Sequence, residues 1–170
     1  MQPLTDAQIR SAFVNASKRE IAQATLPDLD SLKWDKLDAL GWRDPKRPVL
    51  AYVIVEHEGS PVGAILRTAE PSKARRRMLC SWCQDIVTSD DAVLYVAKRA
   101  GAAGRKGNTI GTSICTEFSC SRNVRRTPTT SEVGSDDPTD REAWTARRIA
   151  TLRERSTHFI AEVLDQSSLD

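Results

Sequence analysis

The sequence predicts an α+β domain in which a small antiparallel β-sheet is packed by helices from the two ends of the chain. Residues 49–55 and 62–69 are rich in β-branched and apolar residues, and the polar segment between them contains Gly59 and Pro61, which is typical of a hairpin. Apolar residues recur at helical spacing near both termini. A chain of 170 residues can bury such a core without disulfides.

The N-terminal helix is expected to begin at Thr5. Thr5 and Gln8 have the spacing of a capping box, and Leu4 and Ile9 flank the cap as a hydrophobic staple. The helix then carries an apolar stripe made by Ile9, Ala12, Phe13 and Ala16. This stripe needs an apolar surface to pack against.

Residues 28–48 are expected to form an ordered loop with one helical turn. Gly41, Pro45 and Pro48 interrupt regular structure, and the rings of Trp34 and Trp42 can anchor the loop. Residues 1–48 are therefore expected to comprise the N-terminal helix and a tryptophan-anchored loop.

Two further strands are expected at residues 92–97 and 109–114, joined by the glycine-rich, basic segment 99–108. In this segment Gly104 and Gly107 have the GxxG spacing of the KH backbone clamp. A KH clamp joins two helices, whereas this segment is expected to join strands. A turn with solvated charges is therefore the preferred interpretation.

The end of the chain is expected to form a linker and a helix. Residues 127–138 are rich in Thr, Ser and Pro, which predicts a flexible linker. Residues 139–170 are expected to form an amphipathic helix that begins with a capping box at Thr139 and Glu142. Its apolar face contains Trp144, Ile149, Leu152, Phe159, Ile160, Val163 and Leu164. Because each terminal helix has one apolar stripe, we expect the two to pack together on the sheet.

Four cysteines occur in two close pairs, Cys80 with Cys83 and Cys115 with Cys120. Two thiolates in a tight turn can bind one metal ion, and tetrahedral Zn²⁺, with bonds of about 2.3 Å, requires a second pair. The second pair lies where a strand is expected to end and a short helix to begin, which is the plan of a treble-clef zinc finger. The sequence thus predicts one structural Zn²⁺ within residues 49–126. Four buried or redox-active thiols are the alternative.

The sequence lacks a catalytic signature. Four protein ligands leave a zinc ion no position for a catalytic water, and no Ser-His-Asp, HExxH or paired-carboxylate pattern occurs. His57 and His158 have no nucleophile in motif spacing and are interpreted as surface histidines. We expect no catalytic residues and no cofactor besides Zn²⁺.

The expected location is the cytoplasm, where thiols stay reduced. No apolar run reaches the length of a membrane span, and the residues after Met1 lack the zones of a signal peptide. We expect no contact with a membrane.

Positive charge is concentrated in residues 71–126, which contain eleven basic residues and four acids. A basic run at Lys73, Arg75, Arg76 and Arg77 precedes the first cysteine pair. An anionic partner is expected to bind a basic face made by Lys98, Arg99, Arg105, Lys106, Arg122 and Arg125. Trp82 and Phe118 lie between paired cysteines, where they can be exposed contact residues or pack beneath the metal. Phe118 is included among the partner-binding candidates.

The cysteine pairs, the segments 96–101 and 107–115 between them, and the upstream segment 40–45 (Leu-Gly-Trp-Arg-Asp-Pro) together resemble the FBP-domain proteins. This treble-clef family includes the FusB-type elongation-factor-G-binding proteins of fusidic acid resistance. The resemblance covers nearly the whole chain, although this sequence is shorter at its N-terminus than the resistance proteins. It implies a non-enzymatic role in which the zinc-bearing domain grips the C-terminal domains of elongation factor G and promotes its release from stalled ribosomes.

We therefore expect a monomeric zinc-binding accessory protein that binds elongation factor G on or near the ribosome through its basic face. Direct binding of ribosomal RNA, without a protein partner, is the alternative. It predicts a steep loss of affinity with salt, because each neutralised phosphate releases counterions.

Overall fold

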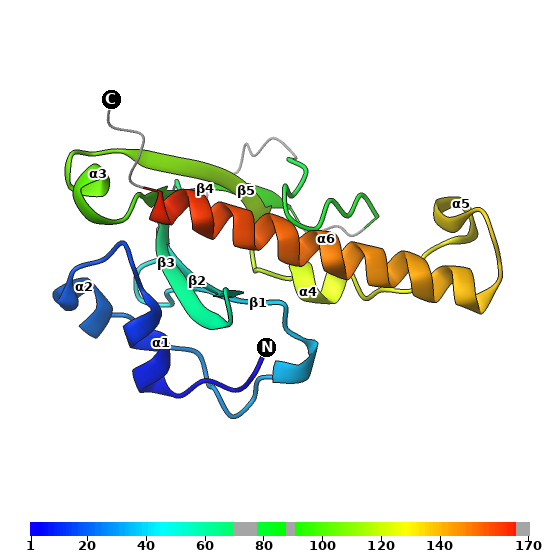
Figure 1. Ribbon diagram of the computed structural model, residues 1–170, viewed down its shortest axis with the longest axis horizontal. Coiled ribbons are helices and arrows are strands. Elements are labelled where there is room, and N and C mark those ends of the chain that lie inside the picture. Colours follow the sequence, from blue (N-terminus) through cyan, green and yellow to red (C-terminus); the bar gives the residue numbers. More distant parts are fainter. Residues whose placement is uncertain (70–77, 88–90, 166–170) are drawn as a thin grey trace.

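Five strands form one antiparallel sheet in the order β1-β2-β3-β4-β5 (Figure 1). The computed structural model describes residues 1–69, 78–87 and 91–165. The strands are β1 (Ala39–Arg43), β2 (Leu50–His57), β3 (Ser60–Arg67), β4 (Ala92–Lys98) and β5 (Thr109–Cys115). Each strand pairs with the next one along the chain, and β2 and β3 form the expected hairpin. The predicted α+β class is confirmed.

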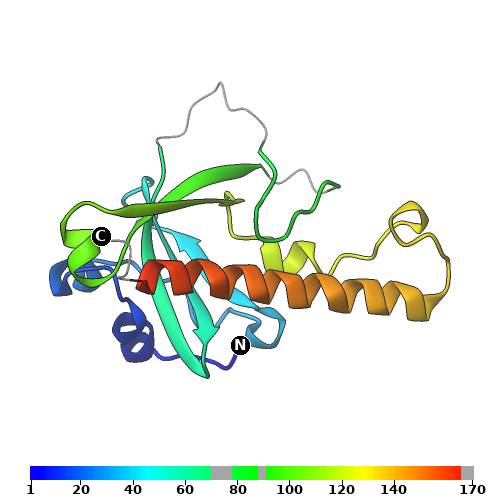
Figure 2. The same cartoon turned by 45° about the horizontal axis from the view of Figure 1, so that its top comes forward.

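The C-terminal helix α6 (Pro138–Leu164) lies across one face of the sheet, and its N-terminal half extends beyond the sheet (Figures 1 and 2). Its buried apolar residues are Leu152, Phe159, Ile160 and Val163. They share a core with Ala51, Val53 and Val55 of β2 and with the four cysteines. Within the described part of the chain, no helix combines the length and the apolar character that a membrane span requires.

The N-terminal helix α1 (Asp6–Ala12) packs on the opposite face of the sheet. Successive residues of β2 point to opposite faces, so Tyr52 and Ile54 join Ile9 and Phe13 in a second core, while their neighbours face α6. The expectation that the two terminal helices pack together is therefore wrong. All six residues from Leu50 to Val55 are buried, which gives each helix a sheet face of its own.

The capping box that begins α1 is confirmed, since Thr5 accepts from the Gln8 N–H and the Gln8 side chain accepts from the Thr5 N–H. The helix ends earlier than the apolar stripe suggests. Phe13 takes an extended conformation, bridges to Gly63 of β3, and places its ring 5.7 Å from that of Tyr52. A second short helix, α2 (Lys18–Ala22), follows with its own capping box.

Residues 28–48 differ from the expected loop. A single 3₁₀ turn, η1 (Trp34–Lys36), is present, but Trp42 belongs to strand β1 and stacks on Tyr52 with ring centroids 4.9 Å apart. Leu40 and Trp42 are buried, and the glycine between them leaves room for Phe118, whose ring atoms lie 2.2 Å from where a Cβ at Gly41 would stand. Gly41 therefore serves close packing, and it does not interrupt the strand.

Three short helices occupy segments that the sequence assigns to turns, the metal unit and the linker. Helix α3 (Gly101–Arg105) lies inside the basic segment that was expected to be a turn. Helix α4 (Cys120–Asn123) is the expected short helix after the second cysteine pair. Helix α5 (Thr130–Val133) lies in the expected linker and is held by a capping box and by an ion pair between Glu132 and Arg126. Helix α6 begins at Pro138 with Asp137 as its N-cap, two residues before the predicted cap at Thr139.

Candidate metal centre

The fold brings the four cysteines together from two distant parts of the chain. Cys80 and Cys83 lie in a turn, Cys115 ends β5, and Cys120 begins α4. All four residues are buried, and their sulfur atoms lie within 4.8 Å of one another. The closest contacts cross between the pairs: the Sγ atoms of Cys80 and Cys120 are 3.5 Å apart, and those of Cys83 and Cys115 are 3.6 Å apart.

These distances fit a tetrahedral zinc ion. Bonds of about 2.3 Å at the tetrahedral angle place neighbouring sulfur atoms about 3.8 Å apart, close to the two distances observed. The four cysteines would hold one Zn²⁺ and complete its coordination. The arrangement of a strand end, a turn and a helix start around the four sulfur atoms is that of a treble-clef finger.

The backbone at each cysteine pair has a special conformation. The Cys83 N–H points to the Sγ of Cys80 at 3.4 Å, so the turn directs a donor at the metal-binding sulfur. Gln84, which follows the first pair, has φ 47, and Phe118, within the second pair, has φ 54. Left-handed conformations are unfavourable for such side chains and persist only where the surroundings fix them. Coordination of both turns to one zinc ion would supply that constraint.

The thiols interact strongly with one another. Hydrogen bonds with Cys115, Cys120 and Cys83 lower the pKa of Cys80, and hydrogen bonds with Cys115, Cys80 and Cys83 raise the pKa of Cys120. A bound divalent cation deprotonates coordinating thiols outright. Asn123 is buried beside them and donates through Nδ2 to the Sγ of Cys115 at 3.5 Å. Such a donor stabilises thiolate charge and orients the ligand.

One arginine of α6 ties the metal unit to the rest of the fold. The Arg148 guanidinium donates to the carbonyl oxygens of Asn123 (3.1 Å) and Cys83 (3.3 Å) and to the Asp85 carboxylate (2.5 Å). The Asp85 side chain is fully buried and also accepts from Arg126 at 2.7 Å. We call Arg148, Asp85 and Arg126 the arginine clamp. It connects helix α6, the first cysteine turn and α4 in one network.

The comparison with protein-family models decides the family. Residues 8–163 match the model described as FBP C-terminal treble-clef zinc-finger. The chain belongs to this family. The match includes all four cysteines and confirms the resemblance predicted from the motifs, whereas a search of the curated proteins gives no match. Family and geometry together make the four cysteines of this FBP-family protein a structural zinc site.

The predicted contact residues of the metal unit occupy different environments. Phe118 is half-buried, with its ring 5.1 Å from that of Tyr95, and Arg122 is exposed on α4. Arg125 donates to the buried carboxylate of Asp38, so its guanidinium is engaged inside the fold.

Trp82 lies within the core. It is 2% exposed, and its ring is 5.9 Å from that of Phe159 in α6. Of the two interpretations that the sequence left open for Trp82, packing beneath the metal is therefore the one that holds.

The remaining predicted basic residues lie far from the metal. Lys98 pairs with Thr109 at one end of the β4–β5 hairpin, whereas Ala92 pairs with Cys115 at the other end. Six residues of strand separate the two ends, or about 20 Å. The expected basic face around the zinc is thus divided into two groups.

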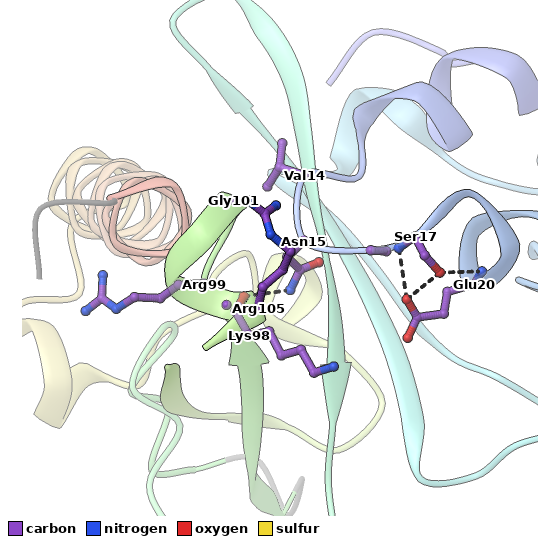
Figure 3. Close-up of a pocket in the computed structure, with 10 residues that line it drawn as sticks. Val14, Asn15, Ser17, Glu20, Lys98, Arg99, Gly101 and Arg105 are labelled. Atoms are coloured by element: carbon purple, nitrogen blue, oxygen red, sulfur yellow. Dashed lines mark hydrogen bonds between the residues drawn. The ribbon is translucent and has the colours of Figure 1, made fainter. Parts of the chain in front are cut away.

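Lys98, Arg99 and Arg105 of the distant group line a cavity of about 290 Å³ between α3, β4 and the segment after α1 (Figure 3). Lys98, Arg105 and Lys106, which we call the distal cations, are exposed and form no ion pair with the described residues. Arg99 instead donates to the carbonyl oxygen of Glu162 in α6. The basic run at Lys73, Arg75, Arg76 and Arg77 lies outside the described residues.

The sequence did not indicate the apolar surface beside the metal. Four large apolar side chains flank the first cysteine pair and are 43–78% exposed; we call Met78, Leu79, Ile86 and Val87 the knuckle patch. The arginine clamp and Asn123 were missed as well. Their polar contacts join residues far apart in sequence, and no local motif marks such pairs.

Proposed function

We propose that this zinc-binding protein is a non-enzymatic accessory protein that binds elongation factor G on or near the ribosome. The proposal includes a cytoplasmic location and a monomeric state. Membership of the FBP family is the observation that carries it, because the family resemblance implies factor binding through the zinc-bearing domain. A zinc ion with four protein ligands also has no free position for a catalytic water, which favours an accessory role.

The surface that we assign to the factor is the knuckle patch together with Arg122. Ile86 is 78% exposed and Val87 is 53% exposed, and they follow Cys83 by three and four residues, next to a turn that a bound zinc ion would hold rigid. Apolar side chains presented on a rigid support lose little conformational entropy on binding, and their burial supplies hydrophobic free energy. Arg122 adds a cation on the neighbouring helix α4.

A pull-down with purified elongation factor G tests this assignment. Ile86→Ser with Val87→Ser is expected to reduce recovery of the factor by about tenfold or more, as removal of central interface residues does. The matched control is Arg105→Glu with Lys106→Glu, which changes exposed residues at the distant end and is expected to leave recovery within about twofold. Zinc content and circular dichroism verify that both variants fold. Absence of factor with the unaltered protein, or equal loss in the two variants, contradicts the proposal.

Binding of ribosomal RNA is the second candidate, and the distal cations favour it. Three exposed cations without ion pairs in the described chain are available to phosphate groups. If RNA binds there, Arg105→Glu with Lys106→Glu weakens a salt-dependent shift of ribosomal RNA, and the slope of log affinity against log salt falls by about 0.7–0.9 for each lost contact. An unchanged slope in this variant contradicts RNA binding at the distal cations.

A further inference from the structure

Strand β5 is an edge strand with backbone groups that no described strand pairs with. Thr116 and Asn108, which are even-numbered, bond to the β4 side of the hairpin. The odd-numbered residues Thr109, Gly111 and Ser113 therefore direct their N–H and C=O groups away from β4. Ser113 confirms this direction, since its carbonyl oxygen accepts from the Ser81 N–H at 2.8 Å.

Helix α6 runs beside this edge (Figures 1 and 2), and a groove of about 680 Å³ lies between them. Gly111 and Thr112 of β5 line one side, and Thr151, Glu154, His158 and Glu162 of α6 line the other. Gly111 is exposed and has no side chain, so another backbone can approach it closely. An edge strand beside a helix is the arrangement in which domains add an extended peptide as a further strand.

The helix wall of the groove is acidic. Glu154, His158 and Glu162 follow at intervals of four residues, so they form one row, with the two carboxylates about 12 Å apart along the axis. Glu154 has no ion pair with the described residues, and among these residues the Glu162 carboxylate pairs with the His158 ring, at 3.8 Å. Arg155, the cation of the groove, points to the Ser81 carbonyl oxygen at 3.4 Å, at the metal end.

We propose that the groove between β5 and α6 binds an extended basic peptide segment of a partner protein by strand addition to β5. Gly111 supplies both main-chain groups, whereas residues 79–81 already cover the edge at Ser113. In an extended chain, side chains four residues apart are separated by about 13 Å and point to the same face. Two lysines or arginines at that spacing match Glu154 and Glu162. This inference does not depend on elongation factor G as the partner.

A synthetic peptide tests the proposal with the zinc-loaded protein. The probe is a fluorescent nine-residue peptide of alternating Thr and Val that carries two lysines four residues apart. We expect saturable binding, and we expect the amide of Gly111 to exchange hydrogen more slowly with the peptide bound, whereas the amide of Gly59 in the β2–β3 turn is unchanged. No saturable binding up to about 1 mM peptide overturns the proposal.

Two controls separate main-chain pairing from simple charge attraction. The same peptide with N-methyl groups on alternate backbone amides keeps its charge but cannot pair with β5, and it should bind at least about tenfold more weakly. Glu154→Gln with Glu162→Gln should weaken binding about tenfold, whereas Glu142→Gln, elsewhere on α6, should change it less than about twofold. Equal binding of the methylated and plain peptides contradicts strand addition. Equal binding to all the protein variants contradicts the assignment of the acidic row.

Discussion

The arginine clamp allows a stability change to be worked out from the structure. Arg148→Ala removes three hydrogen bonds, to the carbonyl oxygens of Asn123 and Cys83 and to the buried carboxylate of Asp85. Removing one partner of a buried ion pair costs about 3–5 kcal/mol. Asp85 retains Arg126 as a partner, so we expect the lower part of this range, a loss of about 3 kcal/mol in the free energy of unfolding.

Urea unfolding of the zinc-loaded protein measures this loss. The matched control is Arg147→Ala, because Arg147 is exposed and adjacent on the same helix, and its replacement should change stability by no more than about 0.5 kcal/mol. A double-mutant cycle with Asp85→Asn should give a coupling energy of about 1–3 kcal/mol. If Arg148→Ala costs no more than Arg147→Ala, the reasoning about the clamp is refuted.

Two further variants probe other contacts. The hydrogen bond that Arg126 donates to Glu132 lowers the pKa of Glu132 from 4.5 to about 2. The ion pair therefore stabilises the fold above about pH 5, and this contribution is lost as the pH falls from 4.5 to 2. Glu132→Gln should therefore cost about 1–3 kcal/mol at pH 7 and progressively less in acid. Gly104→Ala should cost about 3 kcal/mol in thermal or urea unfolding, because its Cβ would lie 1.8 Å from the Arg99 carbonyl oxygen.

Each of these variants has its own control. Wild type and Glu132→Gln are compared at the same pH, so any loss of zinc in acid affects both proteins, and a constant difference from pH 7 to pH 2 contradicts the ion-pair explanation. For Gly104, replacement of the neighbouring Ala102, which is not fully buried, by Ser should change stability by less than about 1 kcal/mol. An equal cost at both positions contradicts the steric argument.

The elements with a local signature were predictable from the sequence. The Thr5 capping box, the hairpin around Gly59 and the metal-binding cysteines follow from short-range patterns, and the structure places each as expected. Strand β1 was missed because Gly41 lowers strand propensity by itself. Its role becomes clear only when Phe118, distant in sequence, packs against it.

The tertiary relations were beyond local reasoning. Two apolar helix stripes predict that each helix needs a surface, but they do not distinguish a shared face from two faces. The unbroken burial from Leu50 to Val55 contains that information, since a strand buried on both sides needs cover on both. The count of basic and acidic residues likewise predicted one basic region, in residues 71–126. Strand geometry divides it, because Lys98 and Cys115 stand at opposite ends of the same hairpin.

The measurement that tests the central claim most directly is the metal content of the protein purified under reducing conditions. Elemental mass spectrometry should find one zinc ion per chain. Cys115→Ser should bring the zinc content close to zero, because three remaining thiolates leave the site open. Chelation of the wild type should then unfold the metal unit and release the N-terminal half of α6 from it. Zinc-free protein with the same near-ultraviolet circular dichroism and unfolding midpoint as the zinc-loaded form would contradict the account.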